Sequence, residues 1–226
     1  MSDRFSKSDQ AYEALESMIT FQELAPGSLL SEAALVERTR LGRTPVREAL
    51  LRLAEQGMVE VHPNRGIRVA EISVESQLQL LEVRRNLEEL AVRLAANRST
   101  AGEREAMLEL AGTLDRFDGE DIHSFAPLLK RSHQLVATGA HNAYLELAMG
   151  PLQGLSRRFW FANLRDVAAE LRRGADRHVA ILRVVPTGDA SGAARASLQL
   201  NDYLTDFTYA VLRERFPVGD HVRVPG

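Results

Sequence analysis

The sequence contains no cysteine, a single tryptophan and no long uninterrupted apolar run. Without cysteine, the chain cannot form disulfides, a thiolate nucleophile or a zinc site with cysteine ligands. No segment approaches the roughly 18 consecutive apolar residues of a membrane-spanning helix. The polar start, MSDRFSKSDQ, also lacks the apolar core of a signal peptide. We therefore expect a cytoplasmic protein with no membrane partner.

The overall charge is slightly acidic but unevenly distributed. The 226 residues include 28 Lys and Arg against 31 Asp and Glu, which gives a net charge of -3. That balance argues against a nucleic-acid partner only as an average over the chain. Between Arg38 and Arg68 there are seven arginines and three glutamates, a local charge of +4. A basic face therefore lies within an acidic protein.

Short elements separated by turns occupy the first third of the chain. Periodicity predicts helices over 8–23, from Ser31 to about 39, and over 44–57, with Thr44 as N-cap and Pro45 as first helical residue. Alternating residues at 58–61 and 67–70 then predict a hairpin. Three helices followed by a hairpin is the order of a winged helix-turn-helix, which we assign to residues 1–73.

Residues 74–226 have a helical pattern throughout. The predicted helices cover 74–97, 100–116, 121–139, 142–162, 165–185 and 189–215, and Pro151 is expected to kink or split the fourth of them. Helices joined by short loops form an antiparallel bundle, a fold that often holds a ligand between facing helices. The fold class is therefore mainly α: a winged helix-turn-helix followed by an all-α bundle.

The start of the third helix carries the residue types that read DNA. Arg43, Thr44 and Arg47 lie at its N-terminal end, where a recognition helix meets base edges and backbone. Arginine binds guanine with two parallel hydrogen bonds, and a helix N-terminus attracts phosphate. Asn64 and Arg65 lie at the hairpin tip, where a wing can follow the neighbouring groove. The alternative is a solvated, salt-bridged surface.

These segments resemble the DNA-binding domain of GntR-family bacterial transcription regulators over about residues 10–72. The motifs are PGSLLSE at 26–32, RTPVREAL at 43–50, GMV at 57–59 and NRG at 64–66. The resemblance implies DNA contacts from Arg43, Thr44, Arg47, Asn64, Arg65 and Gly66. Where the family usually has glycine in the turn, this chain has Arg40, and we expect Gly42 to have taken over that role.

The second domain resembles the FCD effector domain of the FadR subfamily over residues 76–215. The motifs are EVRRNLE at 82–88, HVAIL at 178–182 and GD at 188–189. Six helices would place it near the VanR subgroup. Many such domains hold a divalent metal through one Asp and three His. His133 and His178 match two ligand positions, but Leu129 and Asn201 occupy the other two. We therefore expect no required cofactor, with Zn or Ni the possible metal.

A polar cluster of Arg84, His133, His178 and Asn201 is predicted inside the bundle. A buried arginine opposite imidazoles suits a carboxylate, and the resemblance also implies small organic acids as effectors. The alternative is that each histidine is an ordinary interior side chain. Arg157 and Arg158 beside Phe159–Phe161 could form a base-stacking surface, although core aromatics with a charged flank fit the spacing better.

The combined hypothesis is a ligand-responsive transcription regulator that binds double-stranded DNA at a pseudo-palindrome as a homodimer. Such a protein would be associated with the nucleoid and would not be an enzyme. One alternative is a metal-dependent enzyme in the helical domain, although the chain has no HExxH, GxSxG, P-loop or GxGxxG motif. Another is an architectural DNA binder that responds to no ligand.

Overall fold

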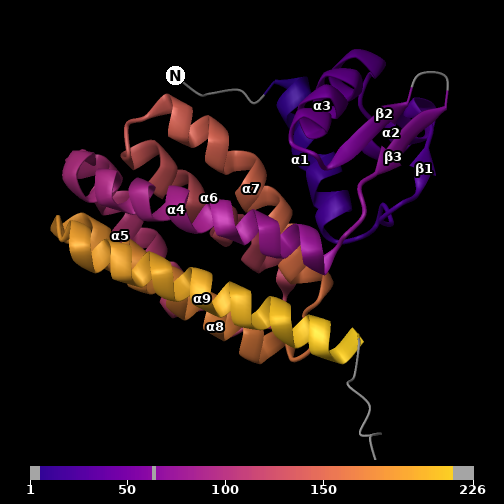
Figure 1. Cartoon of the computed structure of the whole chain (residues 1–226). Coiled ribbons are helices and arrows are strands. Elements are labelled where there is room, and N and C mark those ends of the chain that lie inside the picture. Colours follow the sequence, from indigo (N-terminus) through magenta and orange to yellow (C-terminus); the bar gives the residue numbers. More distant parts are fainter. Residues whose placement is uncertain (1–5, 63–64, 216–226) are drawn as a thin grey trace, which may run out of the picture.

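The computed structural model describes residues 6–62 and 65–215, which form a small N-terminal domain and a helical bundle. Figure 1 shows the N-terminal domain packed against one end of the bundle. The predicted fold class is confirmed: a winged helix-turn-helix precedes six α-helices among the described residues. Within these residues no helix is long and apolar enough to cross a membrane.

The N-terminal domain packs three helices against a small sheet. The helices are α1 (Lys7–Thr20), α2 (Glu32–Thr39) and α3 (Arg43–Glu55), and the strands are β1 (Leu29–Leu30), β2 (Val59–His62) and β3 (Gly66–Val69). The sheet is antiparallel in the order β1-β3-β2. Apolar residues of all three helices, including Leu15, Leu35 and Leu53, fill the core. The two-residue β1 was not predicted, because it is too short to show an alternating pattern.

Helix α3 begins earlier than predicted. Gly42 is the N-cap, Arg43 is the first helical residue, and Pro45 is the third. Thr44 is therefore inside the helix, and its assignment as N-cap is wrong. Proline is tolerated at the third position because the first turn has no intrahelical acceptor for its N–H groups. The predicted stop is confirmed, since Gly57 follows the helix with a φ of 71°.

The turn between α2 and α3 also differs from expectation. Arg40 itself adopts the left-handed conformation, with a φ of 56°, and is the C-cap of α2. Gly42 has a φ of -70°, so it has not taken over the glycine role. Helices α2 and α3 pack against each other across this turn, so Arg40 carries the steric cost of the left-handed conformation.

The bundle consists of α4 (Val74–Arg98), α5 (Ala101–Asp115), α6 (Ile122–Gly139), α7 (Ala143–Ala162), α8 (Val167–Val184) and α9 (Ala190–Arg215), with a 3-10 turn η1 at Val185–Thr187. The long helices α4 and α9 lie alongside each other, and α6, α7 and α8 complete the core. Pro151 does not split α7, which continues for 20 residues. Proline has no N–H to donate to the carbonyl four residues earlier, which is that of Leu147, and Leu147 is an exposed residue.

The aromatic run at the end of α7 belongs to the core. Phe159, Trp160 and Phe161 are 3%, 4% and 7% exposed, and Arg157 and Arg158 are buried as well. Bases could not stack on these rings, so the single-stranded nucleic-acid alternative is wrong.

Helix α7 also forms the junction between the domains. A side chain on Gly154 would lie 2.7 Å from the Met58 side chain, so α7 approaches the N-terminal domain closely here. Leu155 packs against the apolar core of that domain. Arg158 donates a 2.6 Å hydrogen bond to the carbonyl of Ala70, just after β3. One stretch of α7 therefore holds both the N-terminal domain and the segment that leads to α4.

Replacing Arg40 with glycine should stabilise the protein. Glycine adopts the left-handed conformation without a Cβ clash, although it also increases the entropy of the unfolded chain. We expect Arg40→Gly to raise the free energy of unfolding by about 0.5–1 kcal/mol, measured by urea denaturation. Arg40→Ala removes the same side chain but keeps the strain, so it should give no gain. Equal stabilisation by both variants would contradict the explanation.

Candidate functional site

The N-terminal end of α3 presents an exposed basic surface. Arg43, Thr44 and Arg47 all lie in its first turns with exposed side chains. Gly42 supplies no side-chain cap, so the first N–H groups of the helix are free of a capping side chain. Such N–H groups and two arginines together form a site suited to a phosphate and adjacent base edges.

Arg47 is held by an acidic residue of the preceding helix. Its Nε and Nη2 donate to the two carboxylate oxygens of Glu32 at 3.1–3.2 Å. The arginine side chain is nevertheless 68% exposed. An exposed pair of this kind contributes at most about 1 kcal/mol, so a DNA phosphate or a guanine can replace Glu32 readily.

The wing is supported by glycine at its base. Gly66 has a φ of 108°, and a Cβ there would lie 2.5 Å from the carbonyl oxygen of Leu30. The close approach of β1 and β3 therefore requires glycine at position 66. This structural role is separate from the DNA contact predicted for Gly66. Arg65 is exposed in the turn that precedes it. The predicted contact Asn64 lies outside the described residues.

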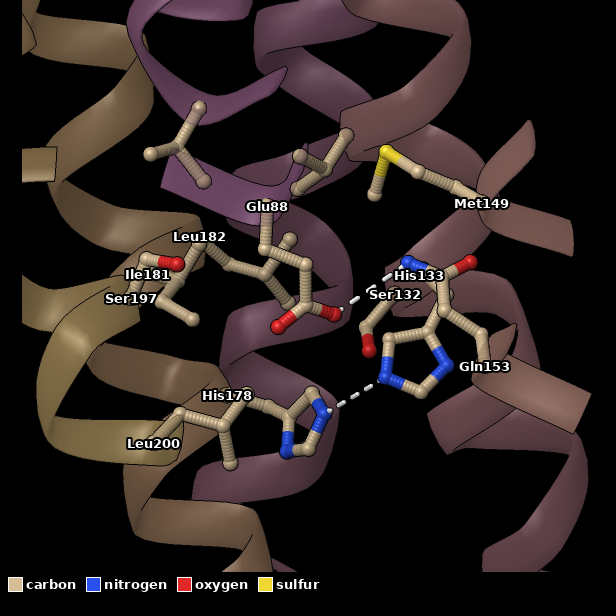
Figure 2. A pocket seen from close by; sticks show the side chains of 12 residues that line it. Glu88, Ser132, His133, Met149, Gln153, His178, Ile181, Leu182, Ser197 and Leu200 are labelled. Atoms are coloured by element: carbon tan, nitrogen blue, oxygen red, sulfur yellow. Dashed lines mark hydrogen bonds between the residues drawn. The ribbon is translucent and has the colours of Figure 1, made fainter. Parts of the chain in front are cut away.

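Three of the predicted effector residues meet in the bundle interior. His133 Nε2 lies 3.2 Å from His178 Nε2 and 3.4 Å from Arg84 Nη2. The three side chains come from α6, α8 and α4, and all are buried. Figure 2 shows the two histidine rings adjacent to each other below Glu88.

Glu88 joins this cluster although sequence reasoning did not select it. Its Oε1 accepts from Arg84 Nε at 2.9 Å and from Gln153 at 3.3 Å (Figure 2), and its Oε2 accepts from Asn201 at 2.8 Å. The predicted Asn201 therefore reaches the cluster through Glu88. The spacing of Arg84 and Glu88, four residues apart on one helix face, is the signal that could have revealed the pair.

The histidine pair cannot satisfy all of its hydrogen bonds. His178 Nδ1 must donate to the Gly174 carbonyl at 2.7 Å, so Nε2 of neutral His178 is an acceptor. If His133 Nε2 carries the proton, it donates to His178 but its N–H faces the N–H of Arg84. If it carries the lone pair, it accepts from Arg84 but faces the lone pair of His178. In both cases His133 Nδ1 has no partner, and Ser197 Oγ and Asn201 Oδ1 also have none. Buried polar atoms without partners commonly face a ligand or ordered water.

Two small cavities flank the histidine pair. One is lined by Glu88, Ser132, Gln153 and Ser197 together with apolar residues such as Met149 (Figure 2). The other is lined by a more basic set that includes Arg84, Arg157, Trp160 and Tyr203. His133, His178 and Leu200 line both, and each cavity measures about 20 Å³. Each has room for about one water molecule, so a larger ligand requires these side chains to move apart.

Burial keeps both histidines neutral. Desolvation lowers the pKa of His178 to about 4; Arg84 also lowers it, whereas the Gly174 carbonyl and Glu88 oppose the shift. Desolvation, followed by the nearby charge of Arg84, holds the pKa of His133 well below its usual value. The cluster at neutral pH is therefore one arginine, one carboxylate and two neutral imidazoles.

The residues present do not fit a metal centre. Leu129 is a buried apolar side chain in α6, and Asn201 Nδ2 faces Glu88. The Arg84 guanidinium lies beside His133 Nε2, where it would repel a cation and compete for the nitrogen lone pair. In the part of the chain that the structure describes, no three His, Asp or Glu side chains come close enough to bind one ion.

Comparison with known proteins gives the family. The model for bacterial regulatory proteins of the GntR family matches residues 7–69, and the model for the FCD domain matches residues 79–202. The chain belongs to the GntR family, with an FCD domain. This is a class of regulators and not of enzymes, which sets aside the metal-dependent enzyme.

Individual relatives are named as transcription regulators. The Nta operon transcriptional regulator of Aminobacter aminovorans is 32% identical over 124 residues, which cover 50% of this chain and 59% of that protein. The HTH-type transcriptional repressor RspR of Escherichia coli K12 is 36% identical over 91 residues, 40% of each chain. This chain therefore spans about half the length of these two relatives. The repressor GlaR of Escherichia coli K12 is 26% identical over 198 residues, 85% of this chain and 90% of that protein.

A solved structure supports the fold. E. coli McbR/YncC superposes with a TM-score of 0.76 at 22% identity, covering 92% of this chain and 99% of that one. At this identity the likeness concerns the arrangement of both domains and not their ligands.

The neutral histidines predict a pH-dependent stability. His178 is protonated below pH 6.5 in the unfolded chain but only below about 4 in the fold, so stability falls as the pH drops through this window. The contribution is about 1.4 kcal/mol per pH unit for each such histidine. His178→Gln should reduce the slope of unfolding free energy between pH 6.5 and 4 by about that amount. His62→Gln on the hairpin is the matched control, and an unchanged slope in His178→Gln would refute the assignment.

Proposed function

We propose that this protein is a ligand-responsive transcription regulator that binds a pseudo-palindromic operator in double-stranded DNA. The proposal rests on one combination: an exposed basic helix terminus in one domain and an incompletely hydrogen-bonded polar cluster in the other. The first suits the DNA major groove, and the second suits a small molecule. Such a regulator would act in the cytoplasm at the nucleoid.

DNA recognition is assigned to Arg43, Thr44 and Arg47, with the wing residues around Arg65 on the adjacent groove. The Arg47 side chain is 68% exposed and its ion pair with Glu32 is weak, so its N–H groups can turn from Glu32 to guanine. A recognition helix with its N-terminus toward the bases would place these three residues at successive base pairs and phosphates.

The test is selection of bound sequences from a random DNA pool, followed by gel-shift titration at fixed salt. We expect a symmetric motif, and Arg47→Ala should lose at least about fivefold in affinity for it, since one bidentate base contact contributes roughly 1–3 kcal/mol. Arg195→Ala, an exposed arginine of α9, is the control for a general loss of charge. Unchanged specific affinity of Arg47→Ala would overturn the assignment of this residue.

The effector is proposed to be a small organic acid, bound without a metal. Arg84 can hold a carboxylate with two charge-assisted bonds if Glu88 gives up part of its contact. The apolar wall around Met149 and Leu200 would take the carbon skeleton. Repeating the selected-DNA titration with a panel of carboxylates, with and without added Zn²⁺ or Ni²⁺, tests this. An architectural DNA binder would respond to none of them.

A homodimer is proposed through an exposed apolar face on α4 and α7. Leu80, Val83, Leu87, Leu90 and Leu94 of α4 follow a spacing of three and four residues, and Val83 and Leu90 are 52% and 44% exposed. This stripe is typical of a seam between two helices. Leu80 of α4 and Leu152 of α7 line one groove. Further along α7, Tyr144 and Leu147 are 89% and 76% exposed. A second copy would cover this face about a twofold axis.

Charge placed in this face should dissociate the dimer. We expect Val83→Glu to shift sedimentation from dimer to monomer because two carboxylates would meet near the symmetry axis. Glu82→Gln changes the neighbouring exposed position and should leave the mass unchanged. A Val83→Glu protein that remains fully dimeric would place the interface elsewhere.

A further inference from the structure

Arg157 on α7 connects the effector cluster with the DNA-binding domain. It lines the basic cavity beside His133 and His178, and it also lines a separate cavity of about 260 Å³ between the two domains. Among the described residues, Arg157 alone lines both cavities. Its charge also lowers the pKa of His133, although burial, Arg84 and His178 each have a larger effect. The Arg157 guanidinium therefore acts electrostatically on His133.

The counter-ion of Arg157 belongs to the other domain. Arg157 Nη2 donates to a carboxylate oxygen of Glu16 in α1, and both side chains are only 7% exposed. Lys130 of α6 binds the same carboxylate at 2.5 Å and Glu13 at 2.7 Å. We call Glu13, Glu16, Lys130 and Arg157 the α1 latch. Within it, Glu16 and Arg157 form a buried ionic contact between α1 and the bundle.

Glu16 has two cationic partners in the latch, whereas Arg157 has only one carboxylate partner there, so Arg157 can exchange Glu16 for another carboxylate. Burial alone would raise the pKa of Glu16, but Arg157 and Lys130 outweigh it and lower the pKa, so Glu16 is ionised. Glu16 keeps Lys130 if Arg157 leaves, whereas Arg157 has no second carboxylate among its hydrogen bonds in the described residues. A carboxylate entering the basic cavity would supply one.

We propose that Arg157 is an effector-binding residue and that the effector carboxylate competes with Glu16 for it. Occupation of the basic cavity then turns the guanidinium inward and weakens the contact between α1 and the bundle, in which Lys130 still binds Glu13 and Glu16. The inference rests on the proposed effector function and adds its regulation: ligand binding changes the position of the DNA-binding domain through one shared cation. The effect requires only that the ligand bind the released form more tightly.

The experiment uses a thiol as a reporter, because the full chain has no cysteine of its own. Ser17 lines the cavity between the domains, so Ser17→Cys reports release of α1 through its rate of reaction with a disulfide reagent. In this background, Glu16→Gln should speed labelling at least tenfold. Glu13→Gln is the matched control, since Glu13 shares Lys130 but does not contact Arg157, and it should change the rate less than twofold.

The ligand arm uses mono- and dicarboxylates of two to six carbons as probes, against potassium chloride at equal ionic strength. At least one acid should speed labelling several-fold, and Arg157→Gln should abolish that response. The double variant Glu16→Met with Arg157→Met leaves no buried unpaired charge, so it should fold; it should respond to no acid.

Each outcome decides the proposal. Equal labelling of Glu16→Gln and Glu13→Gln means that the latch does not hold α1, and the inference fails. Release in Glu16→Gln without any Arg157-dependent acid response means that the contact is structural only, which overturns the competition. The labelling rates involve no DNA, so either failure is separate from operator binding in the gel-shift titration.

Discussion

The buried ion pair between Arg84 and Glu88 determines how the interior of the bundle is organised. An isolated charge could not remain at this depth, and a pair remains only when its other lone pairs and protons are also bonded. Glu88 meets that condition by accepting from Gln153 on α7 and Asn201 on α9. One carboxylate on α4 therefore fixes the relative positions of three helices. The neutral histidines, the two cavities and the unpaired polar atoms of Ser197 and Asn201 lie around this pair.

The second half of α7 brings that interior into contact with the DNA-binding domain. Gln153 and Arg157 face the polar cluster, whereas Leu155 and Arg158 hold the N-terminal domain and the segment after β3. Because residues 153–158 contact both the polar cluster and the N-terminal domain, a movement of this helix segment at the cluster also moves its contacts with the N-terminal domain. This arrangement makes a mechanical connection between the two domains short, and it needs no chain of intermediate contacts.

Much of this architecture could be predicted from the sequence because it depends on local patterns. Helical periodicity and the stop at Gly57 are encoded within a few residues and are confirmed. The left-handed Arg40 and the short β1 were missed because they follow from packing between elements. Within the site, Arg84, His133 and His178 were predictable, and Glu88 could have been found from its spacing. Glu16 and Arg157 are 141 residues apart, and nothing local pairs them.

The small size of the two cavities has a consequence for sensitivity. With room for about one water molecule each, they describe a closed form that any larger ligand would have to open. The apparent dissociation constant is then the intrinsic one divided by the fraction of molecules that are open. The proposed effector would therefore act at higher concentrations than its contacts alone would give. Substitutions that loosen the packing around Met149 or Leu200 would lower the effector concentration that is needed, while leaving every polar contact unchanged.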